Sequence, residues 1–302
     1  SASMLPEIKA PGDIAGYVSE KAANDTGLAK GTPVLVGSTD TVMEVYASGA
    51  IEEGYATIKL ATAGRICLIT SHAIQSRQFF NYRHIIPGLW YPGTGTRSCA
   101  SSYKWFRDVF GDYETARAEQ ENADAYELLN QLASETPTGS SNLFFHPYLM
   151  GEATPYYDDK LRASFTGISM YHGKGHFARA VMEGVSYSMR DCMEEIKTHN
   201  INAKQYRIIG GGAKSALWSQ ILSDVLGESL LRTQNNDSSL GSAMLAGVVS
   251  GMFKDYTDSV EKCVKVSGRI DPNEANVKIY DKGFRVYKEI QKALSAVYRD
   301  SF

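Results

Sequence analysis

The stretch that decides the expected fold is residues 206–226, which read YRIIGGGAKSALWSQILSDVL. The β-prone residues 206–209 predict a strand, and the three glycines after them predict a turn. In residues 215–226 the apolar side chains recur at helical spacing. Another β-prone run follows at residues 230–233. Strands that alternate with helices of this length predict an α/β fold, in which helices flank a sheet.

A similar candidate turn occurs nearer the N-terminus. Residues 55–60 and 65–70 predict two strands, and residues 61–64 between them (ATAG) are the small residues of a tight hairpin. Small side chains allow a ligand to approach the backbone closely. This hairpin is therefore a candidate binding element.

A polar turn before these strands holds a candidate catalytic residue. Residues 32–36 predict a short strand and residues 41–48 predict a helix, with Asp40 between them. Open α/β folds place ligand-handling groups at the ends of their strands. The Asp40 carboxylate could accept a proton from a hydroxyl nucleophile. Aspartate is also a common helix N-cap, and spacing alone favours that interpretation.

Helices and loops account for most of the remaining sequence. Glycine and proline punctuate residues 137–167 and predict loops there. The predicted helices cover residues 14–23, 101–133 (with one long run at 116–132), 176–199, 239–252 and 275–299.

The composition limits the function classes. With 31 Lys+Arg against 34 Asp+Glu, the net charge of -3 argues against nucleic-acid binding. No apolar run reaches the ~18 residues of a membrane span, and no signal-peptide pattern is present. The four cysteines are far apart, which predicts reduced thiols in a cytoplasmic protein.

The glycines at 210–212 have two interpretations. Before a helix they could present backbone amides to an anion or a nucleotide, or they could form a purely structural turn. The spacing does not complete a GxGxxG fingerprint, and no GxxxxGK[ST] loop occurs. His172 and His176 lie four residues apart, but no carboxylate completes a metal set, so no metal ligand is predicted.

A longer match favours a specific family. Residues 163–168 (ASFTGI), a seven-residue spacer and residues 176–183 (HFARAVME) agree with the second signature of the FGGY carbohydrate kinases. The chain resembles the C-terminal half of this family over nearly its whole length, and the xylulokinase-like subgroup most. The resemblance implies an actin-like (ribonuclease H-like) ATPase domain, with a mixed sheet flanked by helices.

The resemblance also assigns roles to the candidate turns. Asp40 matches the family's catalytic aspartate and is expected to act as general base. The hairpin matches a phosphate motif that is usually GTSG, in which Thr62 and Gly64 would face the nucleotide phosphates. Alanine replaces glycine at 61 and serine at 63, which removes a hydroxyl. Alanine also stands at 153, where the family more often has the arginine of a GER motif.

Residues 210–220 match the family's adenosine motif, with Trp218 and Gln220 on the helix that follows the turn. The implied nucleotide contacts are Gly211, Gly212, Ala213 and Ala216, with Ala100 and Lys104 forming the opposite wall of the adenine pocket.

The implied activity is transfer of the γ-phosphate of MgATP to a hydroxyl of a ketopentose, with D-xylulose the first candidate. Family members begin with another actin-like domain, which holds most sugar contacts. The expected organisation is a tag remnant and linker at residues 1–31 and a C-terminal kinase domain at residues 32–302. Without its N-terminal partner domain the chain is expected to be inactive, and a homodimer is one possible assembly. The alternative is a noncatalytic actin-like nucleotide-binding switch or interaction module.

Overall fold

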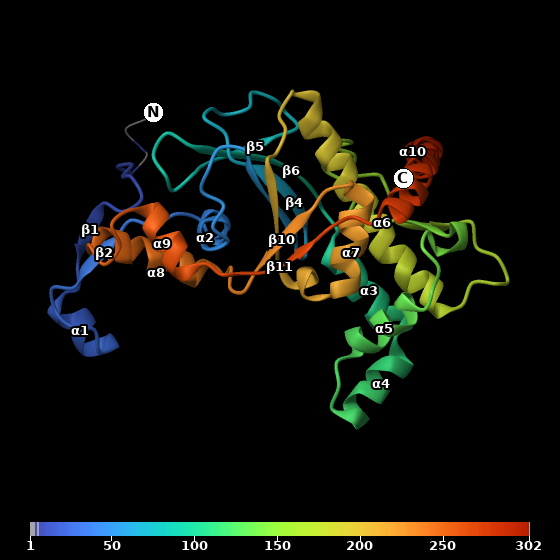
Figure 1. Ribbon diagram of the computed structural model, residues 1–302, viewed down its shortest axis with the longest axis horizontal. Coiled ribbons are helices and arrows are strands. Elements are labelled where there is room, and N and C mark those ends of the chain that lie inside the picture. The colour runs from blue at the N-terminus through green and yellow to red at the C-terminus, as the bar shows by residue number, and fades with distance from the viewer. Residues whose placement is uncertain (1–3, 5, 302) are drawn as a thin grey trace.

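A seven-stranded mixed sheet forms the centre of the protein (Figure 1). The computed structural model describes residue 4 and residues 6–301, so the tag remnant predicted at residues 1–3 lies outside the described residues. The sheet order is β11-β10-β9-β3-β4-β6-β5. Its strands are β3 (Tyr55–Leu60), β4 (Gly64–Leu68), β5 (Phe80–Arg83), β6 (Trp90–Thr96), β9 (Gln205–Ile209), β10 (Leu230–Thr233) and β11 (Val266–Ile270). The neighbours β3, β9 and β10 are parallel, and the other pairs are antiparallel, which confirms the expected mixed sheet.

Ten α-helices are present in the described part of the chain. They are α1 (Glu20–Thr26), α2 (Asp40–Ala47), α3 (Ala100–Phe110), α4 (Asp112–Glu121), α5 (Ala125–Ser134), α6 (Lys174–Thr198), α7 (Ala216–Leu226), α8 (Ser238–Val249), α9 (Tyr256–Cys263) and α10 (Glu274–Ser301).

Side chains alternate along the strands, so the sheet has two buried faces. Ile58 and Ile66 belong to the large core that includes residues of α3, α6 and α7. Cys67 and Tyr91 lie on the opposite face with Val45 of α2. In Figure 1, α2, α8 and α9 accordingly lie on one side of the sheet, and α6, α7 and α10 on the other.

The prediction of a helix at residues 14–23 is wrong in its first half. Residues Ile14–Tyr17 form a strand, β1, and α1 begins only after the N-cap Ser19. β1 pairs antiparallel with β2 (Pro33–Leu35), so β2 belongs to a separate two-stranded sheet. The physical reason is that this pairing satisfies the backbone groups of both strands, which outweighs a weak local helical pattern.

The predicted helical region 101–133 is three helices. The long run predicted at 116–132 is interrupted because Asn122 adopts a left-handed conformation, with φ 51°, and ends α4. Residues 266–270, for which no strand was predicted, form the edge strand β11.

Two further features concern the cysteines and the hydropathy of the helices. All four cysteines are free thiols, and three of them are buried. Within the described residues, no helix has the length and apolar character needed to cross a membrane.

Candidate functional site

The hairpin and the glycine turn lie together at one edge of the sheet. β3 ends at Leu60 and its parallel neighbour β9 ends at Ile209, so the segments after them start side by side. Gly210 has φ 93°, and a Cβ on it would lie 2.6 Å from the Leu60 carbonyl oxygen. A Cβ on Gly212 would lie 2.9 Å from the Leu60 Cβ. Both positions therefore require glycine for the two turns to approach this closely.

The start of α3 lies against the same hairpin. The Ala100 N–H donates to the Ala61 carbonyl oxygen (2.8 Å), and the Cys99 N–H donates to the Thr62 carbonyl oxygen (2.9 Å). The Ser101 hydroxyl also donates to Thr62 (2.7 Å). Gly64 packs closely on Met189, because a Cβ at this position would lie 2.4 Å from the Met189 sulfur. The predicted residues Thr62, Gly64 and Ala100 are thus brought together.

The tip of the hairpin offers hydrogen-bond donors to a ligand. The carbonyl oxygens of Ala61 and Thr62 accept bonds from the start of α3. Among the described residues, the backbone N–H groups of Thr62 and Ala63 and the exposed Thr62 hydroxyl have no protein partner. Consecutive amide N–H groups and a hydroxyl are hydrogen-bond donors that suit phosphate oxygens.

The glycine turn forms a short 3-10 helix, Gly211–Lys214, that leads into α7. A Cβ on Gly211 would meet no atom within 4 Å, so this glycine faces open space. Ala213 is buried, and Ala216 begins α7. The hydroxyl of the N-cap Ser215 accepts a bond from the Trp218 N–H (3.2 Å).

A ring contact joins α7 to α3. The buried Trp218 lies edge-on against Tyr103 of α3, with ring centroids 5.6 Å apart. The two elements predicted as opposite walls of an adenine pocket are therefore held together. Lys104 lies one turn after Ala100, and its ammonium group pairs with Asp108, further along the exposed side of α3. Its part in a nucleotide pocket stays a prediction.

Asp40 is not the helix N-cap that spacing alone favoured. The N-cap of α2 is Thr39, whose hydroxyl accepts from the Val42 N–H (3.4 Å), and Asp40 is the first helical residue. The Asp40 side chain is exposed, and its hydrogen bonds among the described residues come only from Thr41. Because Thr39 caps the helix, the Asp40 carboxylate remains accessible.

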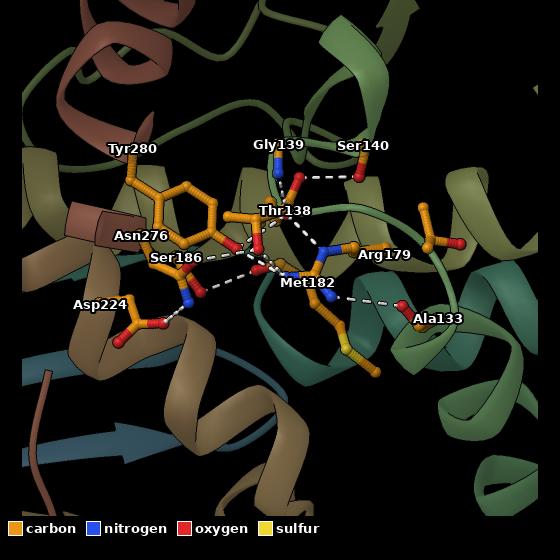
Figure 2. Close-up of polar contacts among 12 residues, drawn as sticks. Ala133, Thr138, Gly139, Ser140, Arg179, Met182, Ser186, Asp224, Asn276 and Tyr280 are labelled. Atoms are coloured by element: carbon orange, nitrogen blue, oxygen red, sulfur yellow. Dashed lines mark hydrogen bonds and ion pairs between the residues drawn. The ribbon is translucent and has the colours of Figure 1, made fainter. Parts of the chain in front are cut away.

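Arg179 and Glu183, two residues of α6 within the expected signature, belong to a buried polar network (Figure 2). Glu183 accepts hydrogen bonds from Arg179 (2.8 Å), Tyr280 (2.8 Å), the Gly139 N–H (2.9 Å) and the Ser140 hydroxyl (2.7 Å). These partners come from α6, α10 and the loop after α5. Arg179 and Glu183 therefore join α6 to α10 and to the loop after α5.

The same network extends to α7. Arg179 donates to the Thr138 hydroxyl (3.2 Å), and Thr138 donates to Asn276 (3.3 Å). Asn276 in turn donates to Asp224 of α7 (2.8 Å), as Figure 2 shows. The helix that follows the glycine turn is thereby fixed to α6 and α10.

Glu152 is a buried carboxylate whose role the sequence did not reveal. Only 1% of it is exposed. It accepts bonds from the Thr96 hydroxyl (2.6 Å), the Arg97 N–H (2.9 Å), the Ala153 N–H (2.7 Å) and the Ser188 hydroxyl (3.1 Å). Burial raises the pKa of this carboxyl. Glu152 thus fixes the segment that leads from β6 into α3, the helix whose start contacts the hairpin.

Comparisons with known proteins show what this chain is similar to. The model of the C-terminal domain of the FGGY family of carbohydrate kinases matches residues 66–250. A xylulose kinase of Staphylococcus epidermidis is 31% identical over 288 residues, covering 94% of this chain and 56% of that protein. A gluconokinase of Bacillus subtilis is 27% identical over 295 residues, covering 95% of this chain and 56% of that protein.

A solved structure shares the fold. The xylulose kinase from Rhodospirillum rubrum superposes with a TM-score of 0.85 and 26% identity, over 98% of this chain and 58% of that chain. This likeness confirms the expected actin-like ATPase fold. The chain spans somewhat more than half the length of the relatives it matches.

Proposed function

The chain belongs to the FGGY family of carbohydrate kinases, and from this membership we propose that it is the nucleotide-binding part of an ATP-dependent sugar kinase. The proposal rests on the observation that three segments lie together at one edge of the sheet. They are the hairpin at 61–64, the start of α3 and the glycine turn at 210–213. The hairpin and the glycine turn resemble the family's phosphate and adenosine motifs, and the start of α3 is the expected opposite wall of the adenine pocket, although the segments are up to about 150 residues apart along the chain.

We propose that residues 32–302 are the C-terminal domain of a two-domain enzyme, and that residues 1–31 lead into it from a preceding domain. The length of the relatives supports this organisation, because the chain covers 56% of each of two of them. In such an enzyme the preceding domain would hold most of the sugar contacts. Phosphoryl transfer requires both domains to close on their substrates, so the isolated chain should be inactive.

In the proposed reaction the nucleotide lies along the three segments. The free N–H groups of Thr62 and Ala63 and the Thr62 hydroxyl would donate hydrogen bonds to the phosphates of ATP. Gly211 would face the adenosine, because the space in front of it is open. Gly212, Ala213 and Ala216 would form the backbone behind this position, since Gly212 packs on Leu60 and Ala213 is buried. Ala100 and Lys104 would border it from α3.

Asp40 would act as the general base. Its carboxylate would take the proton of a sugar hydroxyl while that oxygen attacks the γ-phosphorus in line and ADP leaves. When bound, Mg²⁺ would neutralise charge on the β- and γ-phosphates. Among the described residues no cluster of three or more metal-ligating side chains occurs.

D-Xylulose is the first candidate for the sugar. A xylulose kinase is 31% identical to this chain, while a gluconokinase is 27% identical. D-Gluconate is therefore the second candidate. The exposed Asp40 carboxylate at the start of α2 favours an enzyme over the noncatalytic nucleotide switch, because a switch needs no general base.

The test is the phosphorylation of both sugars by the longer protein that contains this chain. Replacing Asp40→Asn should lower kcat by about 10³-fold, because it removes the general base, while the KM for ATP stays within about twofold. Asp25→Asn is the matched control, since Asp25 is another exposed aspartate, on α1, and should leave kcat unchanged. Unchanged turnover in Asp40→Asn would refute its role as base. Absence of any sugar phosphorylation would favour the switch.

A further inference from the structure

An ion pair attaches the helix that begins at Asp40 to the sheet beside the hairpin. Lys59 is the last residue but one of β3, and its Nζ pairs with Oε2 of Glu44 on α2. The two side chains are 21% and 22% exposed, so solvent screens this pair less than a pair on the open surface.

The strand pattern directs Lys59 toward α2. Its neighbours Ile58 and Leu60 are fully buried in the core formed with α6 and α7. Because side chains alternate along a strand, Lys59 lies on the opposite face, which α2 covers. In the sheet register Lys59 is paired with Arg65 on β4 and Ile209 on β9, which flank the hairpin and the glycine turn.

Glu44 lies one helical turn after Asp40, on the same side of α2. Asp40 itself is exposed, and Thr41 supplies its only hydrogen bonds among the described residues. In the same described part of the chain, no other hydrogen bond or ion pair joins an α2 side chain to β3. Apolar packing, as by Val45, holds α2 on the sheet, and the Glu44–Lys59 pair adds a polar contact between the turn after Asp40 and the strand that carries the hairpin.

We propose that Glu44 and Lys59 are positioning residues for phosphoryl transfer. Their ion pair fixes the first turns of α2, and with them Asp40, against the strand that carries the phosphate-binding hairpin. This inference rests on the proposed function and adds two residues that none of the family motifs matched here contains. In-line transfer needs the reacting groups held within a fraction of an ångström, and a misplacement of about 1 Å can cost about 10²-fold in rate.

The first experiment measures hydrogen exchange of the 302-residue chain. Glu44→Gln and Lys59→Met should each raise the exchange rate of the α2 amides 43–46 by about tenfold, because the helix start loses its attachment. The reversed pair Glu44→Lys with Lys59→Glu should restore the rate. Glu121→Gln breaks an exposed ion pair within α4, with Arg117, and should not change exchange in α2. Unchanged α2 exchange in both single variants would overturn the proposal.

The second experiment measures kinetics of the longer protein. Each single variant should lower kcat about tenfold or more with the KM for ATP within about twofold, and the reversed pair should recover kcat. A raised KM for ATP with unchanged kcat would contradict a positioning role. If the unmodified protein phosphorylates no sugar, the proposed function fails, and the exchange measurement still decides whether the ion pair fixes the helix.

Discussion

At the scale of single residues, the exposed carboxylate of Asp40 and the buried carboxylates of Glu183 and Glu152 have different surroundings and different roles. Asp40 is exposed and bonded only to its neighbour Thr41, which suits a group that must reach a substrate. Glu183 and Glu152 are 3% and 1% exposed and accept several hydrogen bonds each. Both buried carboxylates lie in or beside family motifs, yet the structure assigns them to holding elements together.

Loss of the Glu183 charge should destabilise the whole domain. Glu183→Gln leaves the buried guanidinium of Arg179 without its counter-charge, and breaking a buried pair in this way costs about 3–5 kcal/mol. Ser140→Ala removes one hydrogen bond from the same network and should cost about 1 kcal/mol. Urea unfolding measures both. If the free energy of unfolding falls by the same small amount in both variants, the network contributes little to stability.

Glu152 should give a pH-dependent contribution to stability. Because burial raises its folded pKa above the ordinary value of 4.5, the folded state binds the proton more tightly than the unfolded state. Its contribution is then fully present below about pH 4.5 and is lost as pH rises through the folded pKa. The free energy of unfolding, relative to Glu152→Gln, should therefore fall across this window. A difference that rises with pH would contradict the raised pKa.

At the scale of elements, substitutions of the adjacent glycines 210 and 211 should affect different properties of the chain. Gly210→Ala places a Cβ against the Leu60 carbonyl oxygen at a positive φ, and should destabilise the chain by about 1–3 kcal/mol. Gly211→Val adds a side chain in open space, so the free energy of unfolding should change by less than about 0.5 kcal/mol.

The same two variants separate folding from nucleotide binding. If adenosine lies in front of the turn, the valine side chain in Gly211→Val should weaken ATP binding by about tenfold or more. Calorimetric titration of the longer protein measures this, with thermal unfolding as the check on the fold. Unchanged ATP affinity in Gly211→Val would place the nucleotide elsewhere.

Local patterns predicted the elements that build the candidate site, because each is continuous in sequence. β3 and β10 have the predicted bounds, and the hairpin between β3 and β4 follows from small residues at 61–64. β1 was missed because its strand character comes from pairing with β2, about 20 residues later. The Glu44–Lys59 pair was missed for a related reason, since only the folded chain brings α2 onto β3.

At the scale of the whole molecule, the parallel neighbours β3 and β9 determine where the site forms. Their ends bring the hairpin and the glycine turn together, and α3 and α7 continue from there as two walls joined by Tyr103 and Trp218. If this edge binds the nucleotide and a preceding domain holds most of the sugar contacts, as we propose, this chain alone lacks most of the contacts that place the sugar. Its rate of sugar phosphorylation should be at least about 10³-fold below that of the two-domain protein.

The most direct test of a nucleotide-binding edge is a hydrogen-exchange footprint of MgADP on the longer protein. Binding should protect three separate segments together, residues 61–64, 100–104 and 210–216, because the fold places them at one edge of the sheet. If MgADP leaves the exchange rates of all three segments unchanged and protects another region, for example α6 and α10, the assignment of this edge to the nucleotide is wrong.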